Sequence, residues 1–327
     1  MRTALTTFDQ IKTSDEFIAR ALALFEYQYE ANRVYRSYCD LINIAASEVN
    51  TLEEIPFLPI QFFKSHTVSC SSKPADQVFT SSKTTGQVAS KYHVHDIDLY
   101  IKSFEKGFKH FYGNIEDYAL LALLPSYLDQ GNSSLIYMAN HLIQKTKHPE
   151  SGFYLEDWSK LRTTLNHLEK RGQKTILLGV TYALLNGAEN ESFDLKHTLI
   201  METGGMKGMR KEWVRDALHK KLQEGYGVST IHSEYGMTEL MSQAYSRGEG
   251  RFSCPPWMRV LTRSPEDPFE FIGTLKTGGL NIIDLANVDT CAFIATQDLG
   301  KTYSDGSFEV LGRFDHAEIR GCNLLVV

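Results

Sequence analysis

Cysteine is scarce in this sequence, and the few cysteines present are widely spread. No two of them form a CxxC pair among the 327 residues, and their number is odd: Cys39, Cys70, Cys254, Cys291 and Cys322. This pattern argues against a disulfide framework and against a zinc ribbon. His66 and Cys70 have the spacing of a ligand pair, but no full ligand set accompanies them. Reduced thiols in a cytoplasmic protein are the simplest interpretation.

Long apolar runs are also missing. No stretch approaches the roughly 18 consecutive apolar residues of a membrane helix, so we expect no membrane span. The first 17 residues, MRTALTTFDQIKTSDEF, lack an apolar run of signal-peptide length. The longest apolar run, YALLALLPSYL, is broken by Pro125 and predicts a buried strand.

Positive charge is in deficit. The chain has 34 Lys and Arg against 40 Asp and Glu, which gives a net charge of -6. It contains no arginine-rich arm and no basic block. Nucleic acid is therefore not an expected partner.

The order of apolar and amphipathic segments predicts an α/β fold. Strands are expected at 118–125, 174–180 and 195–205, a strand that runs into a turn at 227–240, and helices at 14–29, 96–111, 133–145, 155–171 and 211–222. Such alternation is typical of a mostly parallel sheet covered by helices. Five short apolar runs beyond Trp257 predict a mainly antiparallel subdomain, at 259–263, 269–275, 279–285, 291–300 and 308–314. We therefore expect an α/β core with an N-terminal helical segment over residues 1–255 and a β-rich subdomain over residues 256–327.

A loop rich in hydroxyl groups lies within VFTSSKTTGQVASKY, residues 78–92. It offers Ser81, Ser82, Thr84 and Thr85 as O–H donors, a positive charge on Lys83, and backbone freedom at Gly86. A turn of this composition can wrap an anion. It does not match the Walker A pattern. An ordinary surface turn rich in Ser and Thr is the alternative interpretation.

A second motif, HSEYGMTEL at residues 232–240, follows an expected strand. Together with the hydroxyl loop it resembles the adenylate-forming superfamily, which includes acyl-CoA synthetases and luciferase-type enzymes. The resemblance implies that the loop, including Ser81, Ser82, Thr84, Thr85 and Gly86, binds the phosphates of ATP. It further implies that Tyr235 packs on adenine beside Gly236, that Thr238 meets phosphate, and that Glu239 holds Mg²⁺.

Two further stretches follow in the order that this superfamily shows. In TQDLGK, Asp298 matches the aspartate that binds the ribose. In GRFDHAEIRGC, residues Gly312, Arg313 and Asp315 match the GR-x-D element, in which the arginine touches ribose and the aspartate marks a hinge. The segment DQGNSSL, residues 129–135, is expected either to line the acyl or nucleotide site or to start a helix capped by Asn132 or Ser133.

A closer resemblance exists to the acyl-protein synthetases of bacterial bioluminescence operons, near the phenylacetate–CoA ligase branch. It is carried by IPFLPIQFFKSH, LLPSYLDQGNSSLIYM and ETGGMKGMRKEW as well as the hydroxyl loop. It implies activation of a fatty or aryl carboxylic acid as acyl-AMP, followed by acyl transfer to a cysteine near the C-terminus and then to a reductase or carrier-protein partner. Cys322, in RGCNLLVV, corresponds to that cysteine.

Two departures from the superfamily pattern stand out. Lys83 replaces a glycine of the loop, and Lys83, Lys91 and Lys207 are the candidates for assisting adenylation. The chain ends soon after the GR-x-D element, so the small C-terminal lid domain is expected to be absent. The alternatives to an acyl-protein synthetase are a phenylacetate-type ligase, with CoA as the acceptor, and a non-catalytic subunit that binds nucleotide or acyl chains.

Overall fold

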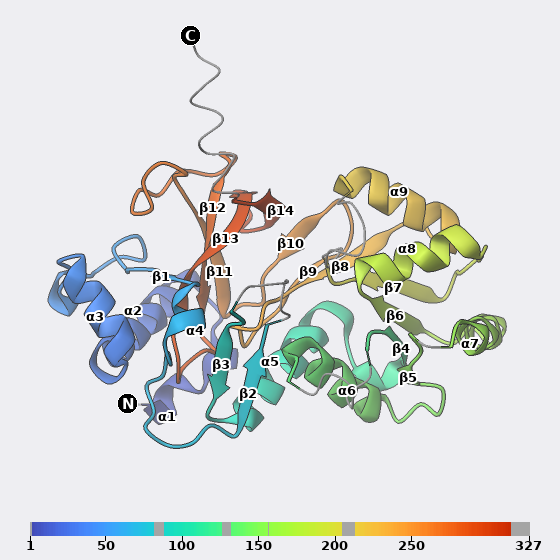
Figure 1. Cartoon of the computed structure of the whole chain (residues 1–327), viewed down its shortest axis with the longest axis horizontal. Helices are drawn as coiled ribbons and strands as arrows, with labels where there is room; N and C mark the ends of the chain where they lie inside the picture. The colour runs from blue at the N-terminus through green and yellow to red at the C-terminus, as the bar shows by residue number, and fades with distance from the viewer. Residues whose placement is uncertain (1, 82–87, 126–131, 156, 205–212, 315–327) are drawn as a thin grey trace, which may run out of the picture. The chain divides into compact units, whose positions relative to one another are not determined.

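The computed structural model describes residues 2–81, 88–125, 132–155, 157–204 and 213–314 (Figure 1). These residues form two compact units. The terminal unit contains residues 2–77, 92–99 and 253–314, and the central unit contains residues 78–81, 88–91 and 100–252 without the gaps named above.

The residues that make up the terminal unit differ from those expected from a division of the chain at residue 255. The N-terminal helices belong with the C-terminal strands, because helix α2 (Ser14–Ala31) is bonded to the segment before strand β13. The Gln28 amide donates to the carbonyls of Asn287 and Val288, at 2.7 and 3.0 Å. The Asn32 amide donates to the carbonyl of Thr290 at 3.0 Å. Contacts between residues about 260 positions apart leave no local signal in the sequence.

The central unit is built on a mostly parallel sheet, as the sequence predicts. Its strand order is β9-β8-β7-β6-β4-β5. The strands are β4 (Ala119–Leu123), β5 (Gly152–Phe153), β6 (Thr175–Gly179), β7 (Thr198–Glu202), β8 (Ile231–Tyr235) and β9 (Ala244–Ser246). All neighbouring pairs from β5 to β8 are parallel, and β9 runs antiparallel to β8.

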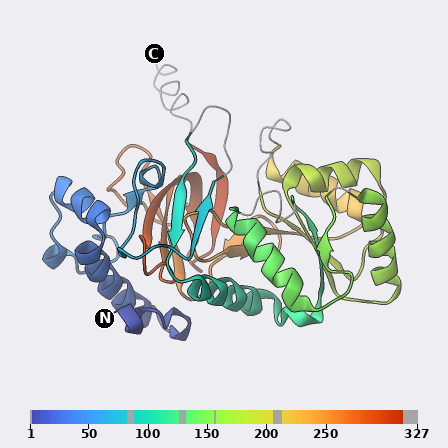
Figure 2. The same cartoon turned by 60° about the horizontal axis from the view of Figure 1, so that its bottom comes forward.

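Helices cover both faces of this sheet. They are α5 (Ile97–Tyr112, nearly all of it in the central unit), α6 (Ser134–Thr146), α7 (Trp158–Lys170), α8 (Thr181–Asn190) and α9 (Arg215–Tyr226), with the short 3₁₀ helix η3 (Ile115–Asp117). Figures 1 and 2 show α6 against one face and α8 with α9 against the other. Every residue of β4 and β6 is buried, which explains their uninterrupted apolar sequences ALLAL and TILLG.

The terminal unit contains the expected antiparallel strands. They are β11 (Met258–Arg263), β12 (Gly278–Asp284), β13 (Phe293–Thr302) and β14 (Phe308–Arg313), paired in that order, and β1 (Leu58–Pro59) adds to β13 in parallel. The strand expected at 269–275 is wrong, since only an isolated bridge joins Phe271 to Arg263. Pro265 and Pro268 lie just before this segment, and Phe269 at its start is exposed. The segment is a loop beside β11.

The helices of the terminal unit lie beside these strands (Figure 1). They are α1 (Arg2–Leu5), η1 (Phe8–Gln10), α2, α3 (Arg33–Leu41), η2 (Ala46–Glu48) and α4 (Phe62–Ser65). Thr13 caps α2, because its side chain accepts from the N–H of Glu16 in a capping box. The ring of Phe25 packs on Tyr35 and Phe293, with centroids 6.0 and 6.2 Å away.

Three short strands lie where the chain passes from one unit to the other. They are β2 (Gln77–Thr80), β3 (Lys91–Val94) and β10 (Arg251–Ser253). Within the described part of the chain, none of the helices combines the length and the apolar composition that crossing a bilayer requires.

Candidate functional site

A polar cavity of about 530 Å³ lies in the central unit, largely at the carboxyl ends of its strands. Open α/β sheets bind their ligands at this edge. The residues around the cavity come from the ends of β2, β7 and β8, from α5 and from the start of α6. They are Thr80, Ser81, Tyr100, Asn132, Ser133, Ser134, Leu135, Met138, Thr203, Glu234, Gly236, Met237, Thr238 and Gln243.

The base of the hydroxyl loop lies at this cavity. Ser81 is held there by a pair of hydrogen bonds with Ser90: the N–H of Ser81 donates to the carbonyl of Ser90 at 3.2 Å, and the N–H of Ser90 donates to Ser81 Oγ at 3.0 Å. The N–H of Thr80 donates to the carbonyl of Asn132 at 2.8 Å. The predicted residues Ser82, Lys83, Thr84, Thr85 and Gly86 lie outside the described residues.

The described part of the DQGNSSL segment lies both at the cavity and at the start of a helix, although Ser133 makes no capping hydrogen bond through its side chain. Its role at an acyl or nucleotide site stays a prediction. Asn132, Ser133 and Ser134 line the cavity, and Ser133 is also the N-cap residue of α6. The hydroxyl of Tyr100, on α5, donates to the carbonyl of Ser134 at 3.2 Å and so ties α5 to the start of α6.

The motif YGMTE follows β8 directly, and three of its residues reach the cavity wall. Gly236, Met237 and Thr238 line the cavity. Tyr235 and Glu239 are not among the described residues that line the cavity, although each is next in sequence to a residue that does. Glu239 is only 4% exposed. Glu239 is therefore a buried residue that follows the cavity residue Thr238 in the sequence.

A pair of buried carboxyl groups, Glu202 and Glu234, was missed by the sequence analysis. Burial and the charge of Glu202 raise the pKa of Glu234 to about 8. Burial alone would also raise the pKa of Glu202, but the neighbouring His219 and the N–H of Gly204 outweigh it and lower that pKa. Glu202 also accepts from Thr181 Oγ1 at 3.0 Å. Glu202 therefore carries the charge and Glu234, at the cavity, stays protonated at neutral pH.

Gly236 lets the carboxyl of Glu234 fold back over the chain. A Cβ atom at this glycine would lie 2.4 Å from Glu234 Oε1. An alanine at this position would therefore require the end of the Glu234 side chain to move. The signal for Glu234 was present in HSEYGMTEL, but an isolated glutamate next to a turn normally indicates an exposed residue.

Two further cavity residues, Thr203 and Gln243, carry buried polar atoms that find no hydrogen-bond partner within the described residues. These atoms are Thr203 Oγ1 and Gln243 Oε1. Thr203 follows β7 and Gln243, which is 5% exposed, precedes β9. Neither residue had a sequence signal, because a lone threonine or glutamine matches no motif.

Asp298 and Arg313, the residues expected at the ribose, face each other in the terminal unit. They are register partners on the antiparallel strands β13 and β14, and Arg313 Nε lies 3.3 Å from Asp298 Oδ1. The Arg313 side chain is 84% exposed, whereas that of Asp298 is 10% exposed. Their ribose-binding role stays a prediction. Asp315 and Cys322 lie outside the described residues.

The four described cysteines are poor nucleophiles. Burial raises the pKa of Cys39 and of Cys254 to about 12, and it also raises the pKa of Cys70 and Cys291. A thiol with a raised pKa is not the reactive thiolate at neutral pH. Among the described residues, no group of three or more His, Cys, Asp or Glu side chains could hold a metal ion.

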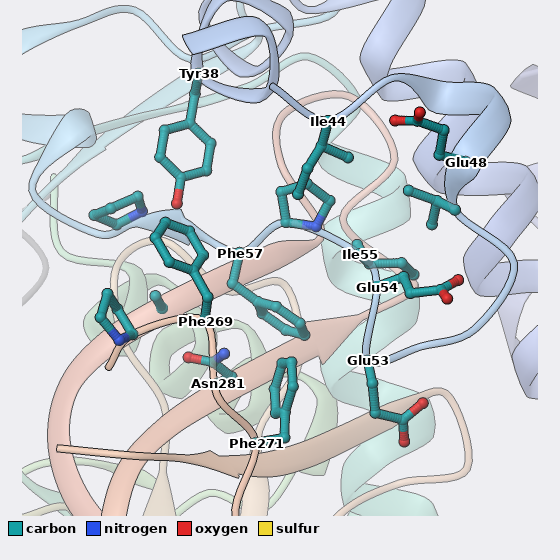
Figure 3. A pocket seen from close by; sticks show the side chains of 15 residues that line it. Tyr38, Ile44, Glu48, Glu53, Glu54, Ile55, Phe57, Phe269, Phe271 and Asn281 are labelled. Atoms are coloured by element: carbon teal, nitrogen blue, oxygen red, sulfur yellow. The ribbon is translucent and has the colours of Figure 1, made fainter. Parts of the chain in front are cut away.

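A second cavity, of about 260 Å³, lies within the terminal unit and has a different chemistry (Figure 3). Its wall is aromatic, and the rings of Phe57 and Phe271 meet edge to face at 5.7 Å. Figure 3 shows Glu48, Glu53 and Glu54 gathered at one side. The backbone N–H groups of Asn50 and Thr51 lower the pKa of Glu54. An ionised carboxylate at this wall would repel an anionic ligand, so the polar cavity is the better candidate site for such a ligand.

Solved structures with the same fold are adenylate-forming acyl-CoA ligases. 2-Hydroxyisobutyryl-CoA ligase, in the postadenylation state in complex with R3-HIB-AMP, matches with a TM-score of 0.68 and 11% identity, over 92% of this chain and 68% of that chain. ATP-bound MatB from Rhodopseudomonas palustris matches with a TM-score of 0.54 and 18% identity, over 72% of this chain and 47% of MatB. The fold is therefore that of an adenylate-forming ligase.

The family follows from the sequence itself. Residues 6–327 match the model of the acyl-protein synthetase LuxE, and the chain belongs to this family. No significant match was found among curated protein sequences. A long-chain-fatty-acid-CoA ligase, FadD1 from Archaeoglobus fulgidus, also shares the fold, with a TM-score of 0.50 and 16% identity over 76% of this chain and 53% of that chain. This chain spans about half the length of MatB and of FadD1.

Proposed function

We propose that this protein activates a carboxylic acid with ATP as acyl-AMP in the polar cavity of the central unit. The observation that carries the proposal is the meeting of two predicted motifs at one cavity. The same cavity is lined by Ser81, at the base of the hydroxyl loop, and by Gly236 and Thr238 of YGMTE. About 155 residues separate the two motifs in the sequence. Membership of the acyl-protein synthetase family supports the same chemistry.

The first half-reaction joins the acid to the α-phosphorus of ATP. A carboxylate oxygen of the acid forms a bond to that phosphorus, the bond from the phosphorus to the bridging oxygen breaks, and pyrophosphate leaves with its electron pair. Two anions must approach each other, so the protein has to supply fixed dipoles and positive charge. The hydroxyl groups of Ser81 and Thr238 are suited to donate to phosphate oxygens. We assign Lys83 the positive charge.

The chemistry of the motif suits a magnesium ion, because it includes one carboxylate, that of Glu239. Mg²⁺ is usually held by one or two carboxylates together with phosphate oxygens and water. Glu239, which directly follows the cavity residue Thr238, is the carboxylate that would hold it. When bound, the ion would offset the charge of the phosphates.

The second half-reaction moves the acyl group to a thiol. A thiolate attacks the acyl carbon, the bond between that carbon and the phosphate oxygen breaks, and AMP leaves. Cys322 is the proposed carrier because burial keeps the other four cysteines protonated. The thioester would then serve a reductase or a carrier protein. ATP and reduced thiols occur together in the cytoplasm, where we place the reaction.

Intact-protein mass and pyrophosphate release test both steps together. With ATP, Mg²⁺ and a panel of carboxylic acids, we expect pyrophosphate and a mass gain of one acyl group, mapped to Cys322. Glu239→Gln should lose both signals, by at least about 100-fold in rate, because removing one element of transition-state charge stabilisation commonly costs this much. Cys322→Ser should keep pyrophosphate release in a single turnover and lose the mass gain.

The matched control is Glu224→Gln, an exposed glutamate on α9. It should behave as the parent protein does. Full activity in Glu239→Gln would contradict the assignment of the site. Acyl label on Cys322→Ser would refute the carrier role, and pyrophosphate without any mass gain in the parent protein would indicate an external thiol such as CoA.

A further inference from the structure

The cavity within the terminal unit has the features of a ligand site and takes no part in the proposed adenylation (Figure 3). Its volume is about 260 Å³, and its walls come from two parts of the chain, residues 38–59 and 268–295. The aromatic rings that line it are those of Tyr38, Phe57, Phe269 and Phe271. Small-molecule sites are typically cavities of roughly 300–1,000 Å³ with apolar and aromatic walls and few polar groups. A cavity somewhat below this range suits a ligand about the size of one substituted aromatic ring.

The charged side chains that line this cavity are all glutamates. Glu48, Glu53 and Glu54 lie together at one side of it, as Figure 3 shows. No residue that the structure describes forms an ion pair with any of the three. Burial lowers the pKa of Arg259 and the charge of Glu53 opposes this effect, but the Arg259 guanidinium lies over the ring of Phe17, 4.2 Å from its centroid. The acidic side of the cavity therefore keeps an excess of negative charge, which attracts cations.

Backbone N–H groups hold two of these carboxylates in place. Glu54 Oε2 accepts from the N–H groups of Asn50 and Thr51 at 2.7 and 3.0 Å. Glu48 Oε2 accepts from the N–H of Ala45 at 3.1 Å. The two bonds at Glu54 lower the pKa of that carboxyl group, so it is ionised at neutral pH. Carboxylates fixed in this way lose little freedom when a cation binds beside them.

A small organic cation uses both parts of this cavity. Its charged end is attracted to the carboxylates and to the faces of aromatic rings, whose quadrupole is negative there. Its apolar part covers the aromatic wall and removes that surface from water. A neutral apolar ligand would take water away from the carboxylates without giving them a partner. An anionic ligand would meet charge of its own sign.

We propose that the terminal unit binds a small organic cation, an alkylammonium or arylammonium ion, with its apolar part against the aromatic rings of this cavity and its charge beside Glu48, Glu53 and Glu54. This inference does not depend on the proposed adenylation, because this cavity lies wholly in the terminal unit and the polar cavity in the central unit. The ligand would contact both residues 38–59 and residues 268–295, so it would also stabilise the terminal unit against unfolding.

The test compares 2-phenylethylammonium with 2-phenylethanol, two compounds that differ only in the end group. Calorimetric titration of the full chain, without ATP, measures the Kd of each. We expect a Kd of about 1 mM or lower for the ammonium ion, as a ligand of this size can reach. This Kd should be at least about tenfold lower than that for the alcohol. Raising the NaCl concentration from about 20 to about 300 mM should weaken binding of the ammonium ion only.

Three variants place the binding in this cavity. Glu53→Gln should weaken binding of the ammonium ion by at least about threefold and leave the alcohol unchanged. Ala295→Leu, which adds volume at the cavity wall, should weaken binding of both compounds. The matched control is Glu26→Gln, an exposed glutamate on α2 in the same unit, and it should behave as the parent protein does. Urea unfolding of each variant shows whether it keeps its fold.

Two outcomes would overturn the inference. The first is equal affinity for the ammonium ion and the alcohol, or no binding of either. The second is a ratio of the two Kd values that stays the same in folded Glu53→Gln, because the ammonium ion would then bind elsewhere. A lack of pyrophosphate release would refute the proposed function and leave this inference standing, since the titration contains no ATP.

Discussion

At the scale of single residues, the structure places an uncharged carboxyl group at the cavity. Glu234 retains its proton because burial and the charge of Glu202 raise its pKa to about 8. An unfolded chain releases the same proton near the ordinary pKa of 4.5. Neutral Glu234 therefore stabilises the folded protein. This contribution is complete below the pKa of Glu234 in the unfolded chain, and it is lost as the pH rises through the pKa of Glu234 in the folded protein.

We predict that Glu234→Gln removes this dependence on pH. The free energy of unfolding of the parent protein should fall, relative to that of the variant, as the pH rises from about 5 to about 8, because only the parent binds a proton more tightly when folded. Urea unfolding at several pH values measures the difference. Glu224→Gln, on the exposed face of α9, should show a constant difference. A difference that stays flat for Glu234→Gln would contradict the buried, protonated state.

Sequence reasoning reached the motif residues but not their buried supports. Ser81, Gly236 and Thr238 were predicted because short motifs keep their residue types and order. Thr203, Glu234 and Gln243 could not be predicted, since their importance comes from burial and from the absence of a partner, and both depend on the folded chain.

At the scale of secondary structure, the packing of α8 on α9 depends on a glycine. Gly225 lies in α9, and a Cβ atom there would come within 2.4 Å of Ala188 Cβ and 2.5 Å of Ala188 Cα. Backbone atoms cannot yield as the end of a long side chain can. The two helices can therefore lie this close only because both contact residues are small.

We predict that Gly225→Ala lowers the free energy of unfolding by about 1–3 kcal/mol through overpacking. The matched control is Gly107→Ala in α5, where a Cβ atom would meet nothing within 4 Å. That change should raise stability by about 0.5–1 kcal/mol, because alanine loses less backbone entropy than glycine in a helix. Equal effects of the two substitutions would refute the close approach of α8 and α9.

Helices and strands with a clear hydrophobic period in their sequence were predicted, and those without such a period were not. The helix expected at 96–111 is α5, and the strand expected at 174–180 contains β6. Helix α8 was missed because TYALLNGAEN combines small residues with an internal glycine and shows little contrast between its faces. The run at 269–275 has the alternation of a strand but pairs only through one bridge.

At the scale of the whole molecule, the two ends of the chain fold into one unit. Helix α2 packs Phe25 against Phe293 and bonds Gln28 to the segment that precedes β13. The N–H of Ala292 donates a hydrogen bond to Gln28 Oε1 at 2.9 Å. The N-terminal helices therefore depend on strands made from residues 258–313.

We predict that a chain shortened to end at Phe252 keeps a protected sheet from β4 to β8 but loses protection in α2 and α3. The shortened chain lacks every strand from β11 to β14, so the apolar face of α2 has no partner. Hydrogen exchange followed by mass spectrometry measures protection segment by segment, with the full chain as the reference. Persistent protection of residues 14–41 would show that these helices form a stable unit of their own.

The dependence of α2 on the last strands has a consequence during synthesis on the ribosome. Residues 78–252 must be translated after the N-terminal segment and before its partners, which takes on the order of ten to thirty seconds at ordinary elongation rates. Throughout this interval Phe17, Leu24 and Phe25, all buried in the finished protein, lack the C-terminal strands of their unit, including Phe293, which packs on Phe25. Helix α2 thus leaves the ribosome well before the strands that complete its packing are made. Its apolar face is a surface that a nascent-chain chaperone can bind during this interval.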